Sequence, residues 1–258
     1  MNITEQSNEQ AVLVERRGRV MIITLNRPEA MNAINGALSH GLWNAVQELN
    51  RDAGLTAGVL TGSGRGFCSG MDLKAFARGE DIGPMGTFIR AGCEKPLIAA
   101  IEGFAIAGGC ELALTCDLLV AAAGAKIAIR EVKVGLFAAG AGLFRLPSRV
   151  GYAKAMEMAI TGDSITAEEA HAAGMITEVT EPGGALDAAV ALAERVAQNA
   201  PLAVAASKKL VRAAAQGYDE EELWKMQEPL FQQVFTSNDA REGPAAFAEK
   251  REPKWSGT

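Results

Sequence analysis

Residues 107–114 have the sequence Ala107-Gly108-Gly109-Cys110-Glu111-Leu112-Ala113-Leu114, in which one carboxylate lies inside an otherwise apolar run. Free backbone N–H groups at the start of a helix attract negative charge, and glycine lets a ligand approach the main chain closely. Loss of solvation raises the pKa of a carboxyl group toward the range useful for proton transfer. The run therefore predicts a glycine turn that opens a helix, with Glu111 as a candidate acid or base.

A second glutamate, Glu131, follows the apolar residues Ile127-Ala128-Ile129 twenty positions further on. If Glu111 and Glu131 face one cavity, they form an acid/base pair. The alternative is that each is a buried acid satisfied by a neighbouring cation or a backbone N–H group.

A second glycine-containing turn has the sequence Phe67-Cys68-Ser69-Gly70-Met71-Asp72-Leu73 and leads into a helix near Lys74. Two N–H groups from two such turns, converging on one oxygen, would form an oxyanion hole for a carbonyl that gains negative charge. The alternative is that both are ordinary strand-to-helix turns.

The composition limits the class of protein. The chain has 258 residues, of which 48% are hydrophobic, enough for one large domain or one domain with a small appendage. A net charge of -6 argues against a general nucleic-acid binder. The four cysteines show no C-x-x-C spacing and there are only two histidines, so we expect free thiols in a reducing cytoplasm and no metal site. The polar start predicts no signal peptide, and no apolar run reaches the ~18 residues of a membrane span.

Strands, glycine turns and helices alternate as far as about residue 146, which indicates an α/β core. A hairpin is expected over residues 12–25 and an amphipathic helix from about residue 38 to residue 50. The rest of the chain predicts helices, one of them opened by a capping box at Thr166-Ala167-Glu168-Glu169. We expect a core over residues 1–195 and a C-terminal helical region over residues 196–258.

The sequence lacks the usual motifs of nucleotide-binding proteins and of serine hydrolases. The glycines of Gly62-Ser63-Gly64-Arg65-Gly66 lack the G-x-G-x-x-G spacing, because Phe67 occupies the place of the third glycine. The G-x-x-x-x-G-K-[ST] loop and the G-x-S-x-G elbow are absent from the sequence. A nucleotide-binding module and a serine hydrolase are therefore disfavoured.

Four segments in order and spacing resemble the enoyl-CoA hydratase/isomerase (crotonase) superfamily. They are Leu25-Asn26-Arg27-Pro28, then Phe67 to Lys74, then Gly103 to Asp117, then Glu131 with Gly135. The resemblance runs from about Val12 to the C-terminus. The ending, from Ser237 to Arg251, is similar to the hydratase branch, and with the turn at Ser69 it is also similar to carnitinyl-CoA dehydratases.

The resemblance implies a crotonase-like α/β fold: a spiral of ββα units with a C-terminal helical region used in trimer formation, and trimers that commonly stack into a hexamer. It implies an acyl-CoA thioester as substrate, with coenzyme A as part of that substrate and no separate cofactor. It places the oxyanion hole at the N–H groups of Met71 and Gly108, and the two catalytic acids at Glu111 and Glu131. The residues it places near coenzyme A are Ala30, Asp72, Leu73, Lys74 and, from a neighbouring subunit, Lys250.

The expected reaction is reversible hydration of a trans-2-enoyl thioester. Water adds at C3 and a proton at C2, through a state that resembles a thioester enolate whose charge the two N–H groups stabilise. We expect Glu111 to activate the water and Glu131 to deliver the proton, although coupled carboxyls titrate as a pair and the roles can be exchanged.

The sequence departs from the family pattern at three places. Arg130 precedes Glu131 where hydratases often have Gly-Gln-Pro-Glu, so Arg130 either pairs with a carboxylate or points away. Residues 136–142, which the resemblance places at the acyl pocket, lack the usual Pro-Gly-rich stretch, and Met71 is larger than the usual alanine. Three alternatives to a hydratase remain: a dehydratase acting on a 3-hydroxyacyl-CoA such as carnitinyl-CoA, an enoyl-CoA isomerase, and a non-catalytic acyl-CoA-binding protein.

Overall fold

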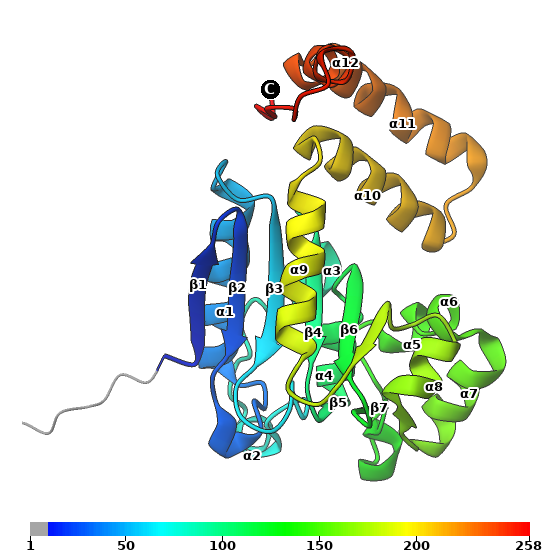
Figure 1. Cartoon of the computed structure of the whole chain (residues 1–258). Coiled ribbons are helices and arrows are strands. Elements are labelled where there is room, and N and C mark those ends of the chain that lie inside the picture. The colour runs from blue at the N-terminus through cyan, green and yellow to red at the C-terminus, as the bar shows by residue number, and fades with distance from the viewer. Residues whose placement is uncertain (1–9) are drawn as a thin grey trace, which may run out of the picture.

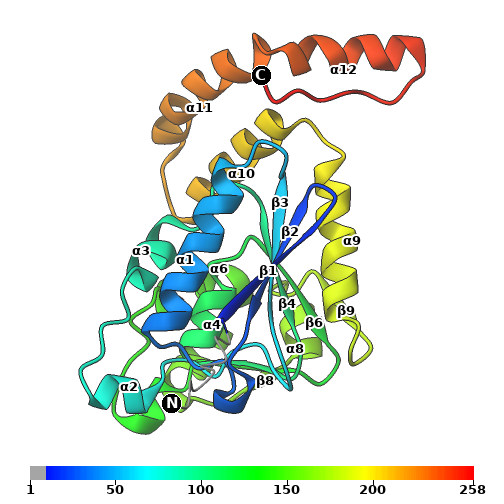
Figure 2. The same cartoon turned by 90° about the vertical axis from the view of Figure 1, so that its left-hand side faces the viewer.

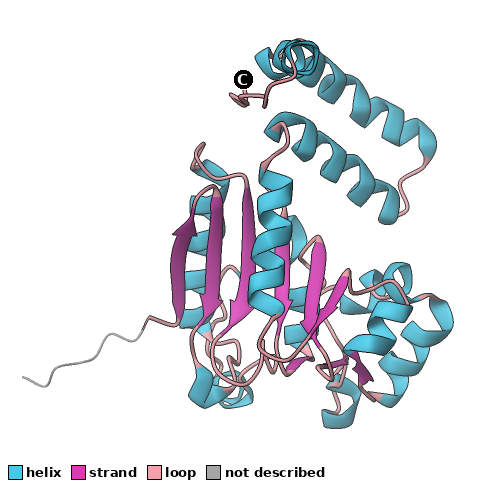
Figure 3. Cartoon of the chain, viewed as in Figure 1, coloured by secondary structure: helices cyan, strands magenta, loops and turns pink. Residues whose placement is uncertain are grey.

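A six-stranded sheet forms the centre of the molecule in the computed structural model, which describes residues 10–258 (Figures 1 and 3). Its strand order is β1-β2-β3-β4-β6-β9. The first two strands are antiparallel and all the others pair in parallel. The strands are β1 (Val12–Arg17), β2 (Val20–Leu25), β3 (Ala57–Gly62), β4 (Leu97–Ile101), β6 (Leu118–Ala122) and β9 (Glu178–Thr180).

Helices cover both faces of this sheet, with α9 (Ala185–Ala197) on one side and α1 (Gly36–Arg51) on the other (Figure 2). Side chains alternate between the faces because successive residues of a strand point to opposite sides. Ile22, Val59 and Ile98 pack in the cluster beneath α9. Their neighbours in the strands pack in the larger cluster with α1, α3 (Met85–Ala91) and α4 (Gly108–Ala113). Since both faces are buried, the central strands are almost wholly apolar.

A second, three-stranded sheet lies at one end of the first. It contains β5 (Phe104–Ile106), β7 (Lys126–Ala128) and β8 (Ile165–Thr166). Consecutive segments supply a strand to the large sheet, a strand to the small sheet and then a helix, as in β4-β5-α4. The unit built on β3 follows the same course, because Cys68 bridges to Ala105 of β5 before α2 (Leu73–Ala77) begins. The predicted ββα units are therefore present.

The remaining helices follow the core. Near the second sheet lie η1 (Pro28–Ala30), η2 (Glu131–Val134), α5 (Gly142–Arg145), α6 (Pro147–Val150), α7 (Tyr152–Thr161) and α8 (Ala167–Ala172). The capping box expected at α8 is formed, because the Thr166 side chain accepts from Glu169 N and the Glu169 side chain accepts from Thr166 N.

Three C-terminal helices extend beyond the end of the large sheet (Figures 1 and 2). They are α10 (Pro201–Ala215), α11 (Glu220–Phe235) and α12 (Asn238–Glu249). The division expected after residue 195 stays a prediction. α9 continues to Ala197, and α10 begins at Pro201, a residue favoured at the first position of a helix.

The sequence predicted the longer elements and missed the shorter ones. The hairpin and α1 match their expected ranges to within a few residues, and α7 and the three C-terminal helices lie in the part of the chain that was expected to be helical. α3, α5, α6, β5 and β9 were not expected, because elements of three to seven residues carry too few positions to show a period. Over residues 10–258 no helix is long and apolar enough to cross a membrane.

A substitution at Gly109 tests the packing of α4 against the segment before α2. A Cβ atom added at Gly109 would lie 2.1 Å from Cys68 O, a main-chain atom. We therefore expect Gly109→Ala to lower the free energy of unfolding by about 1–3 kcal/mol, the usual cost of overpacking. Gly86→Ala in α3 is the matched control, because its Cβ would meet nothing within 4 Å and the change should leave stability equal or slightly higher. Denaturant unfolding of both variants measures this, and equal stabilities would contradict the packing described.

Candidate active site

The two glycine-containing turns meet at the start of α4. The Ile106 N–H donates to Cys68 O at 3.0 Å, which joins β5 to the segment before α2. A Cβ added at Gly70 would lie 3.0 Å from Gly108 N, and one added at Gly108 would lie 3.5 Å from Met71 N. The structure thus brings together the Met71 and Gly108 amides that the sequence predicted as an oxyanion hole.

Both amides are available to a ligand. Within residues 10–258 neither the Met71 N–H nor the Gly108 N–H donates a hydrogen bond to the protein. The backbone around Met71 is nevertheless fixed, since Ile34 N donates to Gly70 O and Asp72 N donates to Ile34 O, at 2.8 and 2.9 Å. The two donors are therefore fixed, unpaired and partly exposed, and they lie side by side. Paired main-chain donors of this kind are what an oxyanion hole requires.

Ala107 holds the turn in a conformation that normally belongs to glycine. Its φ is 53° and its ψ is -128°. Its N–H donates to Ala128 O at 2.8 Å, so β7 holds it in place. A non-glycine residue in such a region stores backbone strain, which is common at functional sites. No pattern in the sequence indicates this strain.

Glu111 lies on α4, with its side chain enclosed by residues 140–142. It is 5% exposed, and its Oε1 accepts from Gly142 N at 2.9 Å. A Cβ at Gly140 would lie 2.6 Å from Glu111 Oε2, and one at Gly142 would lie 2.9 Å from Glu111 Cγ. The two glycines are therefore needed for the main chain to approach the carboxyl group this closely.

Burial raises the pKa of Glu111, and the charge of Glu131 raises it further. The hydrogen bond from Gly142 N opposes the effect of burial most strongly, and Gly140 N and the Arg145 guanidinium lower the pKa as well. The charge of Glu131 acts on Glu111, so the two acids lie near enough for their charges to interact.

Glu131 opens η2 and is partly buried. Its Oε2 is buried and has no hydrogen-bond partner. Burial raises its pKa, while hydrogen bonds from the main chain at Glu131 and Arg130 lower it. An unpaired buried carboxyl oxygen favours the protonated form, which suits a proton donor.

The charge of the Arg130 side chain is not among the causes that shift the pKa of Glu131. That side chain is exposed, and its charge lowers the pKa of Asp163. Of the two alternatives for Arg130, the structure therefore supports the one in which it points away from the site.

The residues expected near coenzyme A lie together, with one exception. Asp72 caps α2 by accepting from Lys74 N and Ala75 N, and it forms an ion pair with Arg27 at 3.2 Å. These hydrogen bonds and Arg27 lower the pKa of Asp72. Leu73 and Lys74 are exposed on α2, and Ala30 ends the neighbouring η1.

Lys250 is the exception. It follows α12, which lies at the opposite end of the molecule from α2 in two perpendicular views (Figures 1 and 2). Within one chain Lys250 therefore does not reach the site, and its expected role depends on a neighbouring subunit.

Comparison with known proteins agrees with this geometry. The sequence model described as enoyl-CoA hydratase/isomerase matches residues 15–258. This chain belongs to the enoyl-CoA hydratase/isomerase family.

The chain is similar, over nearly the whole length of each, to a relative named enoyl-CoA hydratase and to one named carnitinyl-CoA dehydratase. The enoyl-CoA hydratase EchA19 of Mycobacterium tuberculosis is 39% identical, with 94% of this chain and 95% of that protein covered. The carnitinyl-CoA dehydratase of Proteus mirabilis is also 39% identical, with 96% and 99% covered. Among solved structures, the enoyl-CoA hydratase EchA1 of Mycobacterium marinum is 54% identical, with a TM-score of 0.94 over 97% of this chain and 100% of that one. The predicted crotonase fold is confirmed.

The unpaired carboxyl of Glu131 gives a prediction on stability. A pKa raised by folding means that the folded state loses stability as pH rises from the unfolded pKa through the folded one. We expect Glu131→Gln to raise the free energy of unfolding at pH 7 by about 0.5–2 kcal/mol, the range seen when a functional constraint is relieved. The gain should vanish below pH ~4, where the wild-type carboxyl is protonated in both states.

Glu242→Gln is the control of opposite sign. Hydrogen bonds from Arg251 and Lys254 N lower the pKa of Glu242 to about 2. That substitution should lower stability at pH 7. Denaturant unfolding at pH 4 and pH 7 measures both variants, and a destabilised Glu131→Gln at pH 7 would contradict the assignment.

Proposed function

We propose that this protein is an enoyl-CoA hydratase, which adds water reversibly and on one face to a trans-2-enoyl-CoA to give a 3-hydroxyacyl-CoA. One observation carries the proposal: two unpaired main-chain amides, at Met71 and Gly108, lie side by side at the start of the helix that carries Glu111, and burial raises the pKa of both Glu111 and Glu131. Family membership supports the same substrate class.

The amides stabilise the oxygen of the thioester. As water attacks C3, charge moves onto the thioester oxygen, and the N–H groups of Met71 and Gly108 meet that charge where it develops. Losing one such donor typically costs a factor of about 10²–10³ in rate. Only the main chain of Met71 is required, so its larger side chain does not conflict with this role.

The two acids divide the proton transfers. Glu111 accepts hydrogen bonds from Gly142 and Gly140, which favour its ionised form, so it takes the proton of the attacking water. Glu131 has a buried oxygen without a partner, so it holds a proton and delivers it to C2. The two acids are coupled, and their pH profile belongs to the pair.

Coenzyme A binds at the end of the molecule that carries η1 and α2. The partly exposed Ala30 and the exposed Lys74 lie there, and Asp72 fixes the start of α2. Coenzyme A is part of the substrate, and we propose no further cofactor and no metal. The four free buried thiols suit a reducing cytoplasm.

Dehydration of a 3-hydroxyacyl-CoA is the second candidate, because the reverse reaction uses the same groups. The relative named carnitinyl-CoA dehydratase favours testing this direction. An isomerase requires one base on the substrate carbon and no held water, and a binding protein requires neither acid. The pairing of Glu111 with Glu131 supports a hydratase or dehydratase over both.

Substitution of each acid tests the reaction. We expect the purified protein to hydrate crotonyl-CoA, seen as loss of enoyl absorbance. Glu111→Gln and Glu131→Gln should each lower the rate at least ~10²-fold, because positioned acid/base groups contribute that much. Glu181→Gln is the matched control, since Glu181 is exposed in the turn after β9, and it should keep the wild-type rate.

A panel of enoyl-CoA and 3-hydroxyacyl-CoA thioesters, with carnitinyl-CoA among them, assigns the preferred substrate. If wild type binds crotonyl-CoA and turns over none of the panel, the hydratase assignment is wrong and a binding role replaces it.

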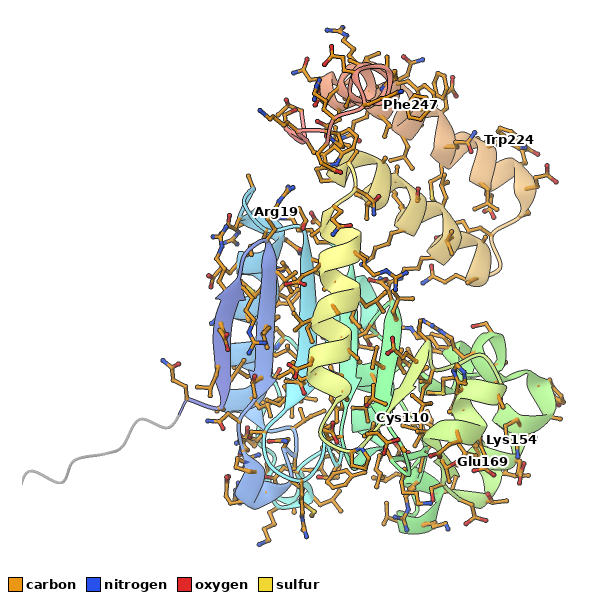
Figure 4. All side chains as sticks on the ribbon, in the orientation of Figure 1. Arg19, Cys110, Lys154, Glu169, Trp224 and Phe247 are labelled. Atoms are coloured by element: carbon orange, nitrogen blue, oxygen red, sulfur yellow. The ribbon has the colours of Figure 1, made fainter. Side chains whose placement is uncertain are left out.

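A homotrimer, or a hexamer of two trimers, is the proposed assembly. The C-terminal helices expose large apolar side chains, with Phe247 86%, Val211 70%, Phe235 66% and Trp224 61% exposed. Figure 4 shows Trp224 on α11 and Phe247 on α12, both outside the core. Apolar surface of this kind marks a protein interface. A second copy of the chain bound to this surface would also be the neighbouring subunit on which the expected role of Lys250 depends.

Charge introduced into this surface tests the assembly. Light scattering should give three or six times the chain mass of 27.0 kDa for wild type. The double variant Phe235→Glu and Phe247→Glu should dissociate, because the new carboxylates lose solvation at the interface. Leu13→Glu on β1 is the control, since Leu13 is exposed apart from the C-terminal helices, and it should leave the mass unchanged. A wild-type monomer would contradict the proposed assembly.

A further inference from the structure

A partly buried arginine next to the site has no carboxylate partner of its own. Arg145 ends α5, three residues after Gly142, and it forms no ion pair within residues 10–258. Burial lowers the pKa of Arg145, and the neighbouring cations Arg212 and Arg149 lower it further. Burying a cation among cations costs stability, so such an arrangement points to a role in function.

Arg145 is connected to Glu111 by hydrogen bonds. One guanidinium nitrogen donates to Thr115 Oγ1 at 2.8 Å. The Thr115 hydroxyl, itself buried, donates to Glu111 O at 3.0 Å. The other guanidinium nitrogen donates to Ile89 O in α3. Arg145 therefore ties α3 and α5 to the turn of α4 that carries Glu111.

The same short helix holds the other end of Glu111. Gly142 N, at the start of α5, donates to the Glu111 carboxyl at 2.9 Å. α5 thus contacts Glu111 twice, at the carboxyl through Gly142 and at the main chain through Arg145 and Thr115. A shift of α5 would move the carboxyl and the backbone of Glu111 together.

We propose that Arg145 is a positioning residue that acts through Thr115 and α5 to hold Glu111 in place and in its ionised form. This inference rests on the function proposed above. The charged or titratable groups that act on Glu111 are Glu131 from η2, Arg145 from α5 and the thiol of Cys110, which precedes Glu111 on α4. Burial raises the pKa of the Cys110 thiol, so this thiol stays protonated. Arg145 is the only cation among them, within the described chain.

Arg149 is a matched control for Arg145. It is also partly buried and also donates to main-chain carbonyls near the end of α4, at Asp117 O and Cys116 O, 3.2 and 3.3 Å. Within residues 10–258 it forms no hydrogen bond or ion pair with Glu111 or Thr115. A loss caused only by a missing buried arginine should therefore be the same in both variants.

The first test compares Arg145→Met with Arg149→Met. For Arg145→Met we expect kcat for crotonyl-CoA to fall about 10- to 100-fold, the scale of a small misplacement of a reacting group, with KM within about threefold. Since the arginine lowers the pKa of Glu111, its removal raises that pKa, and the acidic limb of the pH profile should move to higher pH. Arg149→Met should lower stability without moving the limb. Equal effects on the two profiles would overturn the proposal.

Two further variants keep the test independent of folding. Thr115→Val keeps the side-chain volume and removes the hydroxyl, and it should reproduce part of the fall in kcat. Arg145→Lys restores the charge without the forked donor, so the pH limb should return while kcat recovers only in part. If Thr115→Val has the wild-type kcat, the connection through Thr115 is wrong.

A direct titration separates this inference from the proposed function. The pKa of the Glu111 carboxyl, followed by carbon NMR, should rise in Arg145→Met and stay unchanged in Arg149→Met. This result is expected even if wild type hydrates no enoyl-CoA, in which case only the proposed function fails. An unchanged pKa in Arg145→Met would overturn the inference with the function left standing.

Discussion

The contact between α4 and the segment before α2 is the constraint on which the site depends. Gly109 packs against Cys68 O at a distance that leaves no room for a side chain. This contact brings Gly108 N beside Met71 N and directs the next turn of α4, with Glu111, toward residues 140–142. The two parallel units β3-α2 and β4-β5-α4 therefore supply one amide each, and neither unit forms the pair alone.

The two acids in apolar surroundings differ in how far hydrogen bonds offset their loss of solvation. Glu111 receives main-chain hydrogen bonds from residues 140 and 142, which offset part of its lost solvation. Glu131 has an oxygen without a partner, and an unsatisfied buried polar atom costs about 1–3 kcal/mol. The large apolar core beneath the six-stranded sheet can bear this cost. Hydrogen bonds therefore offset the rise in pKa caused by burial for both acids, and at Glu131 one carboxyl oxygen still has no partner.

The sequence predicted the parts whose signal is local. Glu111 and Glu131 stand out as acids in apolar runs, the glycine turns precede helices, and the longer helices show a clear period. The roles of Gly140, Gly142 and Arg145 could not be predicted in the same way, because each depends on α5 folding back onto α4 from thirty residues away in the chain. The direction of Arg130 was undecided for the same reason, since only the folded chain shows that it lies near Asp163.

The presence of a second acid discriminates between the candidate reactions better than the amides of Met71 and Gly108 do. An oxyanion site stabilises any thioester enolate, so it suits a hydratase, a dehydratase and an isomerase alike. Water addition needs one group to take a proton from water and another to give one to carbon, and the site contains two acids, Glu111 and Glu131, whose pKa values burial raises. By microscopic reversibility the same pair serves dehydration. In the proposed mechanism the site determines the chemistry at C2 and C3, while the concentrations of enoyl-CoA and 3-hydroxyacyl-CoA decide the direction in which the reaction runs.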